Sequence, residues 1–294
     1  MYVYLNDYLS FSETCFILSH YTKWSIKEKW CFLNEFYQEE PIFQDTFRQY
    51  EKLSEKKKAS FFEFKAKFDV HKQLQSLKSH DVSFVSINDP SYPFMLKEIF
   101  LPPLILFYKG SYDWLSSNIV GIVGARECTE YGQKSVDTLV PELIKQGITI
   151  SSGLARGIDT RAHKASMRAC GRTIAVIGTG LDRYYPGENQ RLQRKIEKEQ
   201  LILSEFPLGT RPLKHHFPLR NRIISGISSG VIVVEAKKRS GSLITAYQAL
   251  EQNRDVYAIP GSIFEERSAG TNDLIKIGAK LVTSAKDVIE DLNF

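Results

Sequence analysis

The strongest constraint on the fold is an alternation of short apolar runs with amphipathic stretches between residues 119 and 282. The runs are mostly β-branched and do not alternate with polar residues, which is typical of strands covered on both faces. They occupy residues 119–123, 148–151, 173–177, 201–204, 231–234, 256–259 and 280–282. Helical spacing fills stretches between them, at 132–145, 159–169, 190–198 and 243–252. This order predicts an α/β fold with a doubly wound, mostly parallel sheet.

The first 78 residues have a different pattern. Apolar residues recur three and four positions apart, as in Phe32, Leu33 and Phe36, with lysine and glutamate between them. This periodicity predicts a small all-helical domain over residues 1–78, interrupted by a polar linker at 53–58. The proline-containing segments 89–93 and 101–103 predict an extended strap that leads into a second domain, residues 79–294.

Composition excludes several classes of protein. An apolar content of 43% in 294 residues is enough to form a core. The four cysteines lie far apart without a C-x-x-C pair, which argues against a disulfide framework and a zinc site. No stretch approaches the roughly 20 apolar residues that a membrane helix needs, and no secretory leader is evident. We therefore expect a cytoplasmic protein without a membrane association, a metal or another cofactor.

The positive charge is concentrated in one part of the chain. Residues 156–239 contain 17 lysines and arginines against 7 aspartates and glutamates, whereas the whole chain has a net charge of only +5. Some of these cations belong to the solvated face of a predicted helix at 190–198. The remainder predicts a basic surface that binds a polyanion.

Glycines and cations follow the predicted strands. In a doubly wound sheet, ligands bind outside the carboxyl ends of the strands, where the strand order reverses. The turn after the first run has Gly124 with Arg126, and the turn after the second has Ser152, Gly153 and Gly157 with Arg156. The turn after the third run carries two glycines, Gly178 and Gly180. After the fifth run, the cations Lys237, Lys238 and Arg239 precede Ser240, Gly241 and Ser242. Backbone N–H groups in such turns can hold phosphates. The alternative is that the glycines only make tight turns and that Arg126 pairs with an acid such as Glu235.

Known nucleotide and catalytic motifs do not fit. Arg183 stands where the dinucleotide fingerprint requires a glycine or alanine, and no Walker loop is present. His215 and His216 lack a third ligand at a readable spacing, and His163 is expected to contact Asp159, the predicted helix cap, within one turn. Neither a nucleophile nor a general base emerges.

The segment 218–226 indicates phosphate binding. Its two arginines, Arg220 and Arg222, flank Asn221, and guanidinium groups suit phosphate oxygens. The nearby aromatic residues Tyr184, Tyr185 and Phe217 either stack on bases, as in single-strand binding proteins, or pack within their loops.

With these residues in view, the chain resembles the DNA-processing protein A family (DprA/Smf) over about residues 84–292. The motifs are the turn at 124–126, the loop 152–159 with His163, the segment 175–182 with Tyr185, Pro186 and Asn189, and the segments 217–226, 235–245 and 254–261. The resemblance implies a Rossmann-like domain that binds single-stranded DNA and loads the RecA recombinase in natural transformation, without enzymatic activity. It also implies a sterile-alpha-motif-like helical domain at the N-terminus.

Motifs and resemblance together give the predicted DNA-binding residues Gly124, Arg126, Ser152, Gly153, Arg156, Gly157, Gly178, Gly180, Arg183, Asn189, Arg220, Asn221, Arg222, Lys238, Arg239, Ser240, Gly241 and Ser242. Family members resemble one another in dimerising near the chain end. We therefore expect a homodimer with Leu250, Ile275 and Leu281 as apolar anchors.

Two other functions remain open at this point. One is a nucleoside-monophosphate phosphoribohydrolase of the LOG type, in which a carboxylate such as Glu235 assists glycosidic cleavage. The segment Ser240 to Ser242 departs from the Pro-Gly-Gly-x-Gly-Thr turn of those enzymes. The other is a protein whose basic face binds an acidic partner protein. Incubation with nucleoside monophosphates and a gel shift with an oligonucleotide would separate these alternatives.

Overall fold

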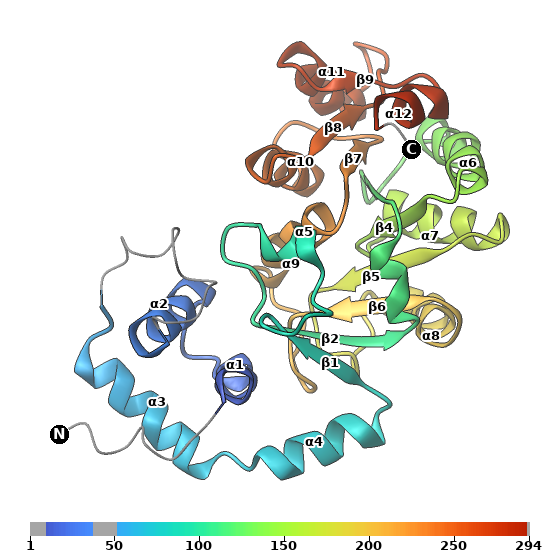
Figure 1. Ribbon diagram of the computed structural model, residues 1–294. Coiled ribbons are helices and arrows are strands. Elements are labelled where there is room, and N and C mark those ends of the chain that lie inside the picture. Colours follow the sequence, from blue (N-terminus) through green and yellow to red (C-terminus); the bar gives the residue numbers. More distant parts are fainter. Residues whose placement is uncertain (1–9, 38–51, 293–294) are drawn as a thin grey trace.

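A single mixed sheet organises the chain (Figure 1). The computed structural model describes residues 10–37 and 52–292. Within them the strand order is β1-β2-β6-β5-β4-β3-β7-β8-β9. The strands are β1 (Ser83–Ser86), β2 (Ile105–Gly110), β3 (Ile119–Val123), β4 (Thr149–Ser152), β5 (Thr173–Ile177), β6 (Leu201–Ser204), β7 (Gly230–Val233), β8 (Asp255–Ala258) and β9 (Lys280–Leu281). The predicted α/β fold with a doubly wound, mostly parallel sheet is confirmed.

The strand order reverses between β3 and β7. From β3 the chain builds outward through β4 and β5 to β6, and then returns to the other side of β3 to add β7, β8 and β9. All pairs from β6 to β9 are parallel, and Gly121 of β3 lies opposite Ser151 of β4 and Val231 of β7. The carboxyl ends of β3 and β7 therefore flank the position where this topology places a ligand.

Helices cover both faces of the sheet. They are α5 (Phe94–Lys97), α6 (Glu130–Lys145), α7 (Ile158–Arg168), α8 (Gln190–Glu199), α9 (His216–Gly226), α10 (Gly241–Glu251), α11 (Ala269–Lys276) and α12 (Ala285–Asp291). Val120 and Ile122 of β3 pack in a core with residues of α6 and α7, whereas Ile119 and Val123 belong to the core that includes α9 and α10. Alternate side chains are thus buried on opposite faces, which explains the apolar runs without polar alternation.

The predicted strap lies between two strands that the sequence interpretation missed. β1 and β2 pair antiparallel with each other, and β2 pairs antiparallel with β6, so they extend the parallel sheet at one edge. The prolines at 93, 102 and 103 lie outside both strands and occupy the connection between them. They mark turns, as predicted, and these turns lie between the two strands.

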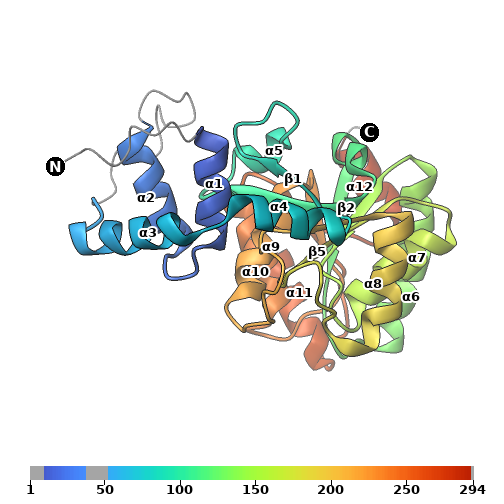
Figure 2. The same cartoon turned by 90° about the horizontal axis from the view of Figure 1, so that it is seen from below.

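The N-terminal helices are α1 (Phe11–His20), α2 (Ile26–Phe36), α3 (Glu55–Lys67) and α4 (Val70–Ser79). Helix α3 begins within the predicted linker 53–58, so that interpretation was wrong from Glu55 onward. Phe16 packs against Phe84 of β1 with ring centroids 4.9 Å apart, and Trp30 Nε1 donates a hydrogen bond to Pro102 O at 2.9 Å. The helices therefore share a core with the edge of the sheet (Figure 2). A domain boundary at residue 78 stays a prediction.

Within the described residues, no helix has the length and apolar character needed to cross a bilayer.

Candidate functional site

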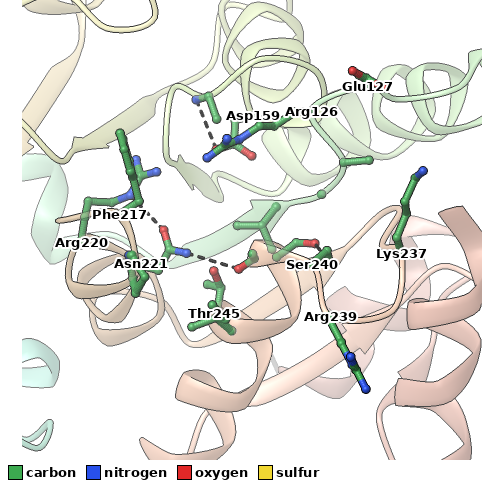
Figure 3. Close-up of a pocket in the computed structure, with 18 of the residues that line it drawn as sticks. Arg126, Glu127, Asp159, Phe217, Arg220, Asn221, Lys237, Arg239, Ser240 and Thr245 are labelled. Carbon is green, nitrogen blue, oxygen red and sulfur yellow. Dashed lines mark hydrogen bonds between the residues drawn. The ribbon is translucent and has the colours of Figure 1, made fainter. Parts of the chain in front are cut away.

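A cleft of about 710 Å³ lies at the reversal point of the sheet (Figure 3). Its walls come from the turns after β3 and β7, the start of α7, the start of α9 and the first turns of α10. Cations outnumber acids among the lining side chains: Arg126, Lys214, Arg220, Lys237, Lys238, Arg239 and Arg267 against Glu127 and Asp159. The residue content of the cleft is that of an anion-binding site.

The turn after β3 is held by close backbone packing. A Cβ atom on Gly124 would lie 2.7 Å from Cγ1 of Ile158, and Ile158 N donates to Ala125 O at 3.2 Å. Gly157 has a φ of +70°, and a side chain there would collide with Ala125 O. Glycine is required at position 157 because the backbone of the loop after β3 lies against it, and at position 124 because the Ile158 side chain does.

Arg126 lies exposed at this junction. Its guanidinium carbon is 5.9 Å from the centroid of the Phe217 ring. None of the ion pairs in the described part of the chain includes Arg126. Glu235, the acid considered above as a partner of Arg126, instead contacts Thr129, the N-cap residue of α6. It accepts hydrogen bonds from Thr129 N at 2.9 Å and from Thr129 Oγ1. Arg126 is therefore free to bind an anion.

The loop after β4 surrounds a buried carboxylate. Asp159 is only 6% exposed and accepts a hydrogen bond from Ala155 N at 3.3 Å. Burial raises the pKa of the Asp159 carboxyl, and the charge of Arg220 opposes that rise. Gly157, and not Asp159, is the N-cap of α7, so the predicted capping role was wrong. His163 contacts Thr173 Oγ1 at 2.7 Å instead of Asp159.

Arg220 forms part of the cleft floor. It is 5% exposed and donates from its Nη1 atom to the carbonyl oxygens of Gly153 and Val176. Its Nε atom donates to Asn221 Oδ1 at 3.0 Å, and Asn221 Nδ2 donates to Gly241 O at 3.4 Å. Burial lowers the pKa of Arg220 to about 10. Arg220 and Asn221 thus connect the loops that build the cleft.

Arg222 lies elsewhere, contrary to the prediction that it contacts phosphate. Its Nη2 atom donates to both carboxylate oxygens of Glu205 at 2.6 Å, and both side chains are largely buried. Two residues along an α-helix correspond to a rotation of about 200°. Arg220 and Arg222 therefore cannot face the same cleft, and Arg222 stabilises the opposite side of α9.

The turn after β5 borders a smaller cavity of about 110 Å³, which shares Arg126, Tyr185 and Phe217 with the cleft. Gly178 lines this cavity, and the Tyr185 and Phe217 rings lie 5.4 Å apart between centroids. Tyr185 is 44% exposed, so this aromatic pair is accessible at the cleft rim.

Several predicted DNA-binding residues have structural contacts instead of a place in the larger cleft. Ser152 Oγ donates to Ile122 O at 2.6 Å, and the buried Asn189 donates to Leu154 O at 2.9 Å. Arg183 pairs with Asp182 at 3.3 Å, and Arg156 pairs with Glu188 at 2.8 Å. Arg156 nevertheless lines the smaller cavity together with Gly153 and Gly178.

The turn after β7 brings three exposed cations to the start of α10. Lys237 pairs with Glu266 at 2.7 Å, and Lys238 lies 3.6 Å from Asp273. Arg239 has a φ of +61°, and Figure 3 shows Lys237 and Arg239 extending in different directions from the same turn. A left-handed conformation is uncommon for an arginine and is typical of functional turns.

The N-terminus of α10 opens toward the cleft. The N-cap residue Ser240 makes no side-chain bond to the helix backbone, and its Oγ lies 2.9 Å from Ser242 Oγ. A Cβ on Gly241 would meet nothing within 4 Å. Thr245 Oγ1 is buried without a hydrogen-bond partner in the described structure. Free N–H groups at a helix N-terminus attract anions, which fits the prediction for residues 240–242.

Sequence reasoning missed two cations of the cleft, Lys214 and Arg267. Lys214 lies on the long connection after β6, and Arg267 lies in the short 3₁₀ helix Glu266–Ser268. Neither residue lies next to a glycine turn, the sequence feature that marks the other candidate cations. His216 stacks on Phe206 with ring centroids 4.1 Å apart, so it packs within its loop. Within the described residues, no cluster of histidine, cysteine or acidic side chains could hold a metal ion.

The chain is similar in sequence to several known proteins. The family model described as DNA recombination-mediator protein A matches residues 83–293. The chain is 54% identical over 209 residues to the DNA processing protein DprA of Streptococcus pneumoniae, covering 71% of this chain and 74% of that protein. It is 49% identical over 220 residues to the DNA processing protein DprA of Bacillus subtilis, covering 74% of each.

Two solved structures are also similar. The X-ray structure of DNA processing protein A from Streptococcus pneumoniae has a TM-score of 0.82 and 41% identity, covering 97% of this chain and 99% of that chain. The structure of DNA processing protein A from Helicobacter pylori, which concerns its single-stranded DNA binding mode, has a TM-score of 0.66 and 31% identity. It covers 72% of this chain and 95% of that chain.

Proposed function

Because the chain belongs to the DNA recombination-mediator protein A family, also named DprA or Smf, we propose that it binds single-stranded DNA in the cleft between β3 and β7. The observation that carries this proposal is Arg126, an exposed guanidinium beside the Phe217 ring at the point where glycine-walled turns meet. A guanidinium holds phosphate oxygens with two hydrogen bonds, and an accessible aromatic ring stacks on bases of any sequence.

Several groups support phosphate binding along the same cleft. Lys214, Arg239 and Arg267 surround it, and α10 points its N-terminus into it. Arg220 lies beneath the cleft and holds the backbone at Gly153 and Val176 through hydrogen bonds to their carbonyl oxygens. We assign direct phosphate contacts to the exposed cations Arg126, Lys214 and Arg239 and to the α10 N-terminus, and a positioning role to Arg220, Asn221 and Asn189.

The finer part of the proposal is a mediator role, in which the protein delivers bound DNA to the RecA recombinase during natural transformation. Family membership supports it, since the matching model describes a recombination mediator. The proposed mediator acts as a homodimer in the cytoplasm and catalyses no reaction of its own.

The proposed dimer surface comprises the end of α10, α11 and β9. Leu250 and Leu281 are exposed by 49% and 48%, whereas Ile275 is half-buried and packs against the core. Ile277, one residue after α11, is 63% exposed and is a better anchor than Ile275.

The test is a titration of labelled oligonucleotides of several sequences at increasing salt. We expect binding with little sequence preference and an affinity that falls linearly with salt on logarithmic axes, because phosphate contacts release counterions. An affinity that does not change with salt would contradict the proposal. Release of ribose 5-phosphate from a nucleoside monophosphate would favour the phosphoribohydrolase instead, although both oxygens of Glu235 are engaged by Thr129.

A further inference from the structure

The turn between β8 and α11 displays two large apolar side chains to solvent. Ile263 is 86% exposed and Phe264 is 93% exposed, the highest values among the large hydrophobic residues described. Glu265 N donates to Ser262 O at 3.1 Å, so Ile263 and Phe264 occupy the central positions of a four-residue turn. Glycine, proline, asparagine and aspartate are the usual residues at such positions. An isoleucine and a phenylalanine there need an explanation other than turn formation.

The turn is anchored on both sides. Asn272 of α11 exchanges two hydrogen bonds with Gly261, donating to its carbonyl oxygen at 3.0 Å and accepting from its N–H at 3.2 Å. Tyr131 of α6 donates to Pro260 O at 2.7 Å. After the turn, Ala236 N donates to Arg267 O at 2.7 Å. The two apolar side chains are therefore presented by a fixed backbone.

The acidic residues next to the turn are neutralised. Glu266 pairs with Lys237 at 2.7 Å, and Glu265 lies 3.3 Å from Arg267. The pairing with Lys237 lowers the pKa of Glu266. Both cations of these pairs line the cleft, whereas no residue of the turn itself does, so the turn adjoins the cleft wall as an outer rim on the β8 side. This rim presents apolar side chains, with its acidic residues neutralised, next to the positively charged cleft.

We propose that Phe264, flanked by Ile263, is a base-stacking platform that extends the path of single-stranded DNA beyond the cleft. The inference rests on the proposed function and deepens it. Cations in the cleft hold the phosphates, and bases that turn outward need an aromatic or apolar surface to replace the stacking lost in a single strand. The pair Tyr185 and Phe217 lines the cleft itself, so the proposed path joins one aromatic position in the cleft to a second one beyond it.

The test compares F264A with F94A in the full-length protein. Phe94 is also an exposed phenylalanine, at 74%, but it lies on α5, and the cleft lining does not include it. Each variant is titrated with an oligonucleotide of about 6 nucleotides, which fits the cleft alone, and with one of about 20 nucleotides. A 2-aminopurine base placed along the longer oligonucleotide reports stacking by quenching of its fluorescence.

We expect F264A to weaken binding of the longer oligonucleotide about tenfold, as expected for loss of one base–aromatic stack. The salt dependence stays unchanged, since no phosphate contact is removed. The short oligonucleotide binds F264A as it binds the wild type, and F94A matches the wild type for both lengths. Quenching at one position of the longer strand is lost in F264A only.

Equal affinities of F264A and F94A for the longer oligonucleotide would overturn the platform while leaving the cleft intact. A changed mass of F264A in solution with unchanged DNA affinity would also overturn it, in favour of a contact between copies of the chain. Failure of the wild type to bind the short oligonucleotide would contradict the proposed function and the platform together.

Discussion

Arg220 and Asp159 are two buried groups of opposite charge beneath the cleft, without a direct ion pair between them in the described structure. Burial disfavours the charged form of each group, which raises the pKa of Asp159 and lowers the pKa of Arg220 to about 10. We interpret Arg220 as the residue that holds the loop after β4 and the end of β5 in place beneath the cleft, through its hydrogen bonds to Gly153 O and Val176 O.

His163, which lies in the same region, is held in its neutral form. Thr173 Oγ1 donates its hydrogen to Ile150 O at 2.9 Å, so it accepts the hydrogen bond from His163 Nδ1 at 2.7 Å. The Nε2 atom is therefore unprotonated, and it is buried without a partner in the described structure. Burial, together with the charge of Arg220, lowers the pKa of His163 to about 3.

This arrangement predicts a pH dependence of stability. The unfolded chain gains a proton on His163 below about pH 6.5 while the folded protein does not, so stability falls as the pH decreases from 6.5 toward 3. At pH 5 the loss relative to pH 7.5 amounts to about 2 kcal/mol from this residue. His163→Asn keeps a donor toward Thr173 and cannot titrate. The variant should lose about 2 kcal/mol less between these pH values in urea unfolding.

The comparison uses differences between two pH values, because the smaller side chain lowers the stability of the variant at both. The pKa of His20, lowered to about 4 mainly by burial, contributes equally to both proteins. An identical pH dependence in wild type and variant would show that His163 is not held neutral.

Among single residues, sequence reasoning succeeded where a glycine turn marked the position. It placed Arg126 and residues 239–242 at the cleft, because strand ends and glycines are visible in the sequence. It could not separate Arg220 from Arg222, since both are charged and the buried partner Glu205 lies 17 positions away in sequence. Which charged side chains form ion pairs across loops depends on tertiary packing, and residue type alone does not determine it.

At the scale of elements, the apolar runs located the parallel strands to within one residue. The run 173–177 coincides with β5, and the run 231–234 is shifted by one from β7. Strands β3 to β7 are buried on both faces, so their sequence pattern is distinct. Strands β1 and β2 were missed because their burial is uneven, with exposed or half-exposed ends, and because flanking prolines indicated turns.

The short edge strand β9 leads to a prediction about assembly. Both of its residues are exposed; Lys280 pairs with Asp255 and Asp291, which leaves Leu281 as the apolar side chain that an unpaired strand edge offers to a partner. Leu281→Glu should convert the proposed dimer to a monomer by weakening association at least about 30-fold, as for loss of a central apolar anchor. Light scattering measures the mass, and Leu74→Glu, which alters an exposed leucine on α4, is the control. A wild-type mass for Leu281→Glu would place the interface elsewhere.

At the scale of the whole molecule, the chain concentrates its binding groups at one edge of the sheet. The turns after β3, β4, β5 and β7 and the starts of α7, α9 and α10 converge there, although they are spread from residue 123 to residue 245 (Figure 3). The N-terminal helices pack instead on β1 and β2, at one end of the strand order (Figure 2). Topology thus brings five cations of the basic segment 156–239 to the cleft, Lys214, Arg220, Lys237, Lys238 and Arg239.

The most direct test of the account is the affinity of Arg126→Ala for single-stranded DNA, measured against salt and together with the melting temperature. Arg183→Ala is the matched control, because Arg183 is an exposed arginine whose contact is Asp182 and which does not line either cavity. We predict that Arg126→Ala keeps the wild-type melting temperature and weakens binding of all sequences alike. The magnitude of its salt slope should fall by about 1, as for one lost phosphate contact. Normal melting with wild-type affinity and an unchanged slope would contradict the assignment of this cleft to DNA.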